Sequence, residues 1–447
     1  MAFITFPYVS RVLGVERIGL VNFVDNTISY FLLFATMGVN LLGVREIASV
    51  KDDAENQNAV FNRLLGLNLR FTTLTLLVYV VTISAIPKLS QYGELFFIGA
   101  SKIIGTAFLV EWFFTGIENF RYITLRSLAI KILYVISVFV FVRTQEDYKL
   151  YFILTTGTVV LNAVINSIYV SKFVKIRWKY FVDTSYLKQN SILGIYNIMT
   201  SMYLTFNVMY LGLVSDNVQV GYYTTAFKVY MVILGLFSAF TNVMMPRMST
   251  LLAEGKQQRF QQLADKSFRA MCTFSIPMIC CSVILAPEII YILSGAGYEG
   301  AITPMRIIMP AALFVGIAQV LAIQILTPMK KDNVLFTASI IGASVSIIIN
   351  VSVVPYMESI GSAIVLLCSE MAVTMTYIIY VLRHKLTTIP LDSVWKNTIL
   401  TAPAAFICIL CSSFIGNPYI LVCTSVPAAM IVWCVCKYIF TPIRQFV

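Results

Sequence analysis

Polar side chains recur at helical spacing inside two long apolar stretches of this chain, at positions 202 residues apart. The aligned pairs are Asn22 with Thr224, Asn26 with Lys228, and Thr36 with Ser238. Side chains at this spacing share one face of a helix. Inside a membrane such a polar face is costly unless it lines protein or water. We therefore expect each stretch to turn its polar face toward a polar cavity.

The two stretches belong to a longer internal repeat. Residues 19–47 are echoed at residues 221–249, and the identical pairs include Gly19 with Gly221, Leu32 with Leu234, Asn40 with Asn242, and Arg45 with Arg247. Two such copies indicate a two-lobed transporter with a polar cavity between the lobes. Arg45 and Arg247 end the two helices, where a basic residue complements the helix C-terminus. Their matched positions also make them candidates for a symmetric inner gate.

Cations outnumber acids inside the apolar stretches. The cations are Arg70, Lys102, Lys131 and Lys228, and the acids are Asp25, Glu111 and Glu370. A buried cation costs about 2.5–3.5 kcal/mol on insertion scales, so these cations need water, acids or an anionic ligand. Glu111 is a candidate partner for Lys131 on the next helix. The remaining excess predicts an electropositive cavity and an anionic substrate.

Arg11, Arg17 and Asp25 lie near the outer end of the first repeat copy. The two arginines are either interfacial residues that reach lipid head groups or a cationic site at the mouth of the cavity. Asp25 lies beside the polar face. It is either paired with a neighbouring cation, or it exchanges a proton or sodium ion and so couples transport to an ion gradient.

The composition predicts an all-α polytopic membrane protein. The chain has 447 residues, of which 59% are hydrophobic and 12% charged, and its mean hydropathy is +0.83. A soluble protein of this size carries about twice that charged fraction. Each apolar run is about twenty residues or more, which is enough to cross roughly 30 Å of hydrocarbon.

Thirteen full membrane spans are predicted. They lie near residues 20–44, 64–86, 93–116, 123–142, 149–171, 189–213, 221–246, 268–293, 302–327, 334–355, 359–382, 397–416 and 418–440. The repeat adds a truncated first helix, because the partner of 189–213 falls at −13 to 11. We predict that the natural protein begins upstream with fourteen helices; the alternative is a genuine half-helix, with residues 1–10 packed as a short stub.

The spans divide into two pseudo-symmetric six-helix lobes and a C-terminal helix pair. The N-terminal lobe covers 1–171, a cytoplasmic inter-lobe loop 172–188, the C-terminal lobe 189–382, and the helix pair 383–447. Of the 32 Lys and Arg residues, 22 fall in the loops and tail of one side and six in the loops of the other. The positive-inside rule places the richer side, with the C-terminus, in the cytoplasm.

Several classes of function lack the residues they need. The single histidine, His384, lies in a charged loop, so no histidine-based metal site or catalytic triad is expected. No phosphate-binding glycine-rich loop is present, and the predicted outer loops are short, so we expect neither a cofactor nor an enzyme. The net charge of +11 follows from topology, and no basic soluble domain exists to bind nucleic acid.

Three segments resemble the Wzx/RfbX-type polysaccharide flippases of the multidrug/oligosaccharidyl-lipid/polysaccharide exporter superfamily. They are residues 6–14 (FPYVSRVLG), 43–48 (GVREIA) and 111–116 (EWFFTG), and the resemblance runs through the whole chain, most densely over 3–130. Residues 10–14 followed by Arg17 also resemble the first helix of the superfamily's lipid II flippases, whose arginines there are implicated in substrate binding. The resemblance implies fourteen helices and transport of polyprenyl-diphosphate-linked oligosaccharide from the cytoplasmic to the outer leaflet.

We therefore expect a flippase of polysaccharide biosynthesis, such as that of the O-antigen of lipopolysaccharide, in the bacterial inner membrane. The predicted substrate-binding residues are Arg11, Arg17, Arg70, Lys102, Lys228, Asn22, Asn26, Asn40, Thr224 and Asn242. The expected partners are the polyprenyl-diphosphate oligosaccharide, membrane lipid, a polysaccharide polymerase and glycosyltransferases. The alternatives are multidrug or small-molecule efflux by the same fold and flipping of a peptidoglycan precursor.

Overall fold

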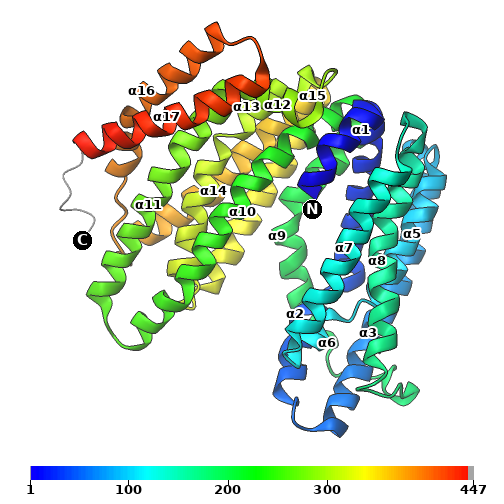
Figure 1. Cartoon of the computed structure of the whole chain (residues 1–447). Helices are drawn as coiled ribbons and strands as arrows, with labels where there is room; N and C mark the ends of the chain where they lie inside the picture. Colours follow the sequence, from blue (N-terminus) through cyan, green and yellow to red (C-terminus); the bar gives the residue numbers. More distant parts are fainter. Residues whose placement is uncertain (1, 441–447) are drawn as a thin grey trace. The chain divides into compact units, whose positions relative to one another are not determined.

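The computed structural model describes residues 2–440, which form helices joined by short connections and contain no strand (Figure 1). The chain divides into two compact units, Met1–Leu213 and Val214–Val447. Among the described residues, eleven helices are long and apolar enough to cross a membrane. The prediction of an all-helical, multi-pass chain is thus confirmed. Met1 and the end of the predicted cytoplasmic tail, residues 441–447, lie outside the described residues.

Unit 1 contains nine helices and two single turns. Their bounds are α1 Ala2–Thr36, α2 Val39–Ser49, α3 Ala54–Ala85, α4 Pro87–Ser90, α5 Gly93–Ala107, α6 Glu111–Gly116, α7 Phe120–Phe141, η1 Gln145–Asp147, α8 Tyr148–Val170, η2 Trp178–Tyr180 and α9 Leu187–Val214. The long helices α1, α3, α5, α7 and α8 pack against one another, and α7 and α8 run side by side (Figure 1). Unit 1 includes most of α9, whereas the predicted lobe boundary lies before this helix; the lobe division stays a prediction.

The first repeat copy and the segment that precedes it are less regular than the sequence suggests. A backbone break at Gly14 (φ 74°, ψ 169°) divides α1, and glycine adopts this conformation without a steric cost. Residues up to 13 form a short helix that packs through Tyr8, whose hydroxyl donates to the Val142 carbonyl at 2.7 Å. The predicted span 20–44 is interrupted at Met37 (φ 41°), before α2 begins. The second copy has no such interruption, because α10 is continuous there.

Unit 2 contains the second repeat copy and the C-terminal helix pair. Its elements are α10 Asn217–Ala253, α11 Gln257–Ile284, α12 Ala286–Ser294, η3 Glu299–Ala301, α13 Ile302–Ile308, α14 Ala311–Gln319, the π-helical η4 Val320–Leu326, α15 Asp332–Arg383, α16 Asp392–Phe414 and α17 Pro418–Phe440. The predicted spans 268–293 and 302–327 are each broken, the second at Met309–Pro310, where proline cannot continue the hydrogen-bond ladder. Within the pair, α16 packs against both α11 and α17 (Figure 1).

The element α15 is a helical hairpin rather than one helix. Glu358 has a left-handed φ of 49°, and a side chain at Gly361 would meet Val354 Cα at 2.9 Å. Residues seven apart in a continuous helix are about 10 Å apart along its axis, so this contact requires the chain to fold back. The two arms correspond to the predicted spans 334–355 and 359–382. Ser215 donates to the Glu358 carboxylate at 2.9 Å and holds the turn.

Candidate functional site

A lysine and an aspartate form an ion pair between α1 and α5 in unit 1. The Nζ of Lys102 lies 2.6 Å from Oδ1 of Asp25, and their side chains are 13% and 31% exposed. The predicted ion-coupling acid and one predicted substrate cation are therefore partners, as one of the two sequence alternatives for Asp25 required. Asn22 and Asn26 are half-buried beside Asp25 on the same helix, and the Asn26 amide donates to the Asn22 carbonyl at 2.8 Å.

Polar side chains also line one face of α8 and of α7. On α8, Tyr151, Thr155, Thr158 and Asn162 follow one another at three- or four-residue steps and are half-buried. The Tyr134 hydroxyl of α7 lies 3.4 Å from Thr155 Oγ1 and links the two helices. Because α1 packs against α5, α7 and α8, these faces and the Asp25–Lys102 pair belong to one polar region, which we call the unit 1 polar path.

Lys131 is the cation of the unit 1 polar path that sequence reasoning left out of the binding site. It lies halfway along α7, is exposed, and shares a helix face with Ser127 and Tyr134. The exposed apolar residues Leu125, Ile132 and Ile136 share a different face of α7, while exposed Leu128 lies one turn from Lys131. Within residues 2–440 no ion pair is found for Lys131. The i, i+3 and i+4 spacing of polar residues on α7 and α8 is the sequence signal that would have found this region.

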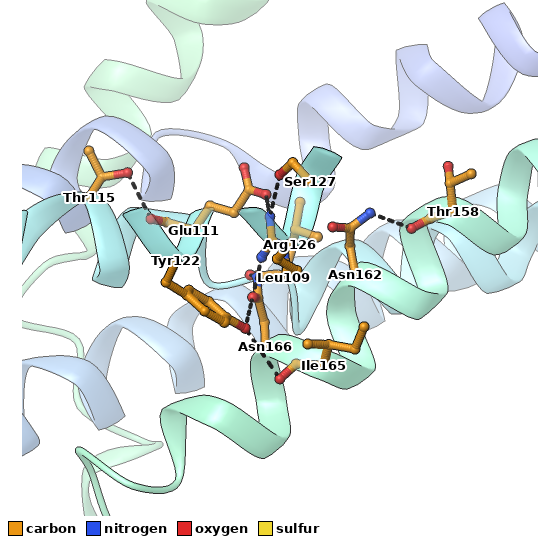
Figure 2. Close-up of polar contacts among 10 residues, drawn as sticks. All are labelled: Leu109, Glu111, Thr115, Tyr122, Arg126, Ser127, Thr158, Asn162, Ile165 and Asn166. Carbon is orange, nitrogen blue, oxygen red and sulfur yellow. Dashed lines mark hydrogen bonds and ion pairs between the residues drawn. The ribbon is translucent and has the colours of Figure 1, made fainter. Parts of the chain in front are cut away.

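An ionic network lies at the end of this region where α7 begins and α8 ends, beside the break in the predicted span 93–116 (Figure 2). The chain leaves its helix at Phe108–Val110, with Val110 at a φ of 37°. The Asn166 amide donates to the Leu109 carbonyl freed by this break. Arg126 of α7 donates both to Asn166 and to the Glu111 carboxylate.

The Arg126 side chain is only 3% exposed, so it depends on these partners. It also donates to Ser127 Oγ at 3.1 Å, and the Tyr122 hydroxyl donates to Asn166 at 2.9 Å. The expectation that Glu111 pairs with Lys131 is wrong. Arg126 of the next helix reaches Glu111 (Figure 2). Lys131 lies five residues further along that helix and therefore on another face.

Arg11 and Arg17 lie away from this network; Arg17 contacts residues of η1 and the start of α8. Arg17 Nη2 is 3.4 Å from the Glu146 carboxylate, and its guanidinium lies 4.5 Å from the centre of the Tyr148 ring. Arg11 is exposed and donates to the Pro7 carbonyl at 2.7 Å within its own helix. These positions fit either predicted role for the two arginines, since both remain accessible.

The Arg70 guanidinium is bound by backbone carbonyl groups and does not line the unit 1 polar path. It donates to the carbonyls of Val182 at 3.5 Å and Asp183 at 2.5 Å, in the α8–α9 connection (residues 171–186). Arg63 on the same helix forms an ion pair of 2.8 Å with the Asp183 carboxylate. The structure thus separates Arg70 from Lys102 and Asp25, with which the sequence grouped it.

The unit 2 copy of the polar face is more buried. Thr224 is buried and donates to the Val220 carbonyl at 2.7 Å, while Lys228 one turn later is half-buried. Ser238 receives a hydrogen bond of 3.1 Å from the side chain of Gln319.

The remaining predicted residues lie on exposed surface. Asn40, Asn242 and Arg247 are exposed, and Arg45 pairs at 3.0 Å with its neighbour Glu46. Their predicted binding and gating roles stay predictions.

A cavity of about 390 Å³ in unit 1 is apolar and differs from the unit 1 polar path. It lies between α1, α3 and α9, and its lining includes Tyr30, Phe34, Phe71, Val78 and Met209. Among the described residues no group of three His, Cys, Asp or Glu side chains is placed to hold a metal ion. The third acid of the predicted membrane set, Glu370, is buried in α15 of unit 2, with 5% of its surface exposed.

The fold is that of known membrane transporters. The chain is similar to the lipid II flippase MurJ in its inward closed conformation, with a TM-score of 0.75 and 17% identity over 98% of each chain. It is also similar to an inward-facing multidrug resistance MATE family transporter of the MOP superfamily, with a TM-score of 0.66 and 12% identity over 86% of this chain and 94% of the other.

The sequence identifies the family. Residues 1–252 match the model of the polysaccharide biosynthesis protein family, and the chain belongs to that family. Two proteins that carry the name "Putative O-antigen transporter" are similar along most of their length. The one from Escherichia coli strain K12 is 23% identical, covering 86% of this chain and 93% of its own length. The one from Shigella dysenteriae is 24% identical, covering 83% and 93%.

Proposed function

We propose that this protein is a flippase that moves a polyprenyl-diphosphate-linked oligosaccharide from the cytoplasmic to the outer leaflet by alternating access. Family membership and the similarity to O-antigen transporters support the substrate class. The fold shared with a lipid flippase supports the mechanism. The observation that carries the proposal is the unit 1 polar path, which presents Lys131 without an ion-pair partner among residues 2–440 at the middle of a membrane helix.

The substrate needs such a path because its diphosphate is charged and its glycan is polar. Removing an ionised group from water into hydrocarbon costs tens of kcal/mol by simple solvation estimates. Lysine ammonium groups and amide, hydroxyl and phenol side chains replace part of the lost hydration, while the polyprenyl tail stays in the lipid. With the cell interior negative, outward movement of an anion is favoured by about 2.3 kcal/mol per charge per 100 mV.

The ion pairs shape the charge of this path. Asp25 and Glu111 are each bound to a cation, so neither presents a free carboxylate. A multidrug exporter of organic cations would need acids available to its cargo. The paired acids therefore favour an anionic cargo over multidrug efflux. A peptidoglycan precursor carries the same diphosphate and differs only in its glycan.

The proposed topology follows the predicted one. Counting the two arms of α15 separately and adding α9 to the eleven candidate spans supports a total of thirteen full spans. We place the protein in the inner membrane with its C-terminus in the cytoplasm, because the basic residues concentrate on one side. A polymerase and glycosyltransferases of the same biosynthesis are proposed partners, since they would consume and supply the substrate.

The test is flipping of lipid-linked oligosaccharide by the reconstituted full chain. We expect Lys131→Gln to lower the rate about tenfold or more, because one hydrogen bond to a charged group contributes about 1.5–3 kcal/mol. Lys131→Arg should retain most of the activity. Arg121→Gln, which removes a charge from the exposed first turn of the same helix, is the matched control and should flip at the wild-type rate. Equal rates for Lys131→Gln and the control would contradict this assignment.

A further inference from the structure

The α8–α9 connection is held rigidly against α3. Buried Asn62 donates to the Lys175 carbonyl at 2.9 Å and accepts from the Arg177 amide at 2.8 Å, while Asn58 accepts from the Lys175 amide at 3.0 Å. Gly66 permits this approach, since a Cβ there would lie 2.5 Å from Phe181 Cα. The connection therefore has a fixed outer surface.

That outer surface combines large apolar and basic side chains. The exposed fractions of Ile176, Trp178 and Val182 are 60%, 74% and 78%. Its exposed basic residues are Lys172, Lys175, Arg177 and Lys179. Val174 of the same connection is only 4% exposed, so the connection already packs one apolar side chain into the protein core. Exposed apolar side chains on a segment so firmly anchored indicate a surface that another phase or molecule covers.

The position of the connection along α3 shows that lipid is the phase that covers this surface. Its residue Val182 accepts a hydrogen bond from Arg70 of α3. From Arg70 to the end of α3 at Ala85 there are fifteen residues, about 22 Å of helix. Roughly 30 Å of hydrocarbon needs about twenty residues of this helix, so the boundary falls near Leu65, between Asn62 and Gly66, which both contact the connection. The connection thus lies at the membrane interface rather than in open water.

We propose that the α8–α9 connection is a docking surface for anionic phospholipid. Trp178, Ile176 and Val182 insert at the boundary between head groups and acyl chains, where tryptophan is favoured. Lys175, Arg177 and Lys179 bind the head-group phosphates, with charge complementarity selecting anionic over zwitterionic lipid. The flipping function is not required for this inference; the proposed orientation decides only which leaflet is bound.

The test measures quenching of Trp178 fluorescence by spin-labelled lipids around the full chain in nanodiscs. The signal of Trp178 is the difference between wild type and Trp178→Phe, which leaves the other tryptophans in place. Phosphatidylglycerol carrying a nitroxide near the head of its acyl chain should quench this signal more than the same fraction of equally labelled phosphatidylcholine. The preference should be about fivefold for each basic side chain engaged.

Two variants locate the preference. Lys175→Gln with Arg177→Gln and Lys179→Gln should abolish it. The matched control removes three exposed charges from the α10–α11 region, Lys256→Gln with Arg259→Gln and Lys266→Gln, and should keep it. Equal quenching by both lipids, or absence of quenching, would overturn the proposal. Loss of the preference on addition of millimolar inorganic diphosphate would also overturn it, by assigning the surface to a soluble anion.

Discussion

Breaking the Asp25–Lys102 pair should destabilise unit 1, and we expect Asp25→Asn or Lys102→Met to lower the free energy of unfolding by about 2–3 kcal/mol. At the observed 2.6 Å and an effective dielectric of about 20, the Coulomb attraction is about 6 kcal/mol. Desolvation offsets several kcal/mol of this. Exposures of 13% and 31% place the pair between exposed pairs, worth about 0.2–1 kcal/mol, and buried ones, where losing a partner costs about 3–5 kcal/mol.

The assay is a double-mutant cycle in which the free energy of unfolding of each variant is measured in mixed micelles with increasing dodecyl sulfate. Because each single change leaves the other charge without its partner, the double variant should be more stable than either single variant, with a coupling energy of about 3 kcal/mol. The pair of Lys149 with Glu94 is the control, since its side chains are 42% and 64% exposed. Its coupling should stay below about 0.5 kcal/mol. Equal couplings for the two pairs would refute this reasoning.

The same variants separate structure from transport. If Lys102 acts only as the partner of Asp25, the double variant should recover flipping together with stability. If Lys102 also binds the diphosphate, the double variant should recover stability but not flipping. An ion-coupling role for Asp25 predicts a third pattern, in which Asp25→Asn flips substrate but no longer responds to an imposed proton or sodium gradient.

Three further predictions concern other contacts. Glu111→Gln should cost about 3–5 kcal/mol in the same unfolding assay, because it leaves Arg126 buried without its counter-charge; a wild-type unfolding curve would disprove this. The pKa of Asp183 is lowered, first by hydrogen bonds from the hydroxyl and amide of the serine two residues later and then by a nearby arginine. The stabilising contribution of the Asp183 carboxylate is complete above about pH 4 and is lost as pH falls through the lowered pKa. Pepsin cleavage of the α8–α9 connection should therefore accelerate only below about pH 4. Asp183→Asn should abolish that acceleration. Gly43→Ala would place a methyl group 2.5 Å from a tryptophan ring and should cost about 1–3 kcal/mol, whereas Gly235→Ala, with nothing within 4 Å, should be nearly neutral; thermal unfolding that shifts both alike would contradict this.

Hydropathy predicted the helical, multi-pass class because each span needs a long apolar run whatever its neighbours are. The breaks were harder to predict. Those at Gly14 and Pro310 carry residues that mark interruptions, and Gly38 adjoins the break at Met37, but Phe108–Val110 contains neither glycine nor proline. That break depends on partners from two other helices, which apolar periodicity does not reveal.

The ion pairs required knowledge of which helices are neighbours. Arg126 lies at the start of the predicted span 123–142 and was not counted among the cations inside the apolar stretches. In the structure it is one of the most buried charges of unit 1. Asp25 and Lys102 are 77 residues apart, and only the packing of α1 on α5 brings them together. The spacing of polar residues on α7 and α8 can be seen in the sequence. That these residues form one polar region with Asp25 and Lys102 follows only from the packing of the helices.

The interruption between α5 and α6 bears on how the transporter can move. An unbonded gap in a membrane helix would act as a hinge, since the free carbonyls could exchange partners as the two halves swing. Here the Leu109 carbonyl is tied to Asn166, which Arg126 in turn fixes to Glu111. These hydrogen bonds and the ion pair fix the interruption in one conformation. The helices α5 to α8 should therefore move as one rigid body, and the bending of the transport cycle should take place in other helices.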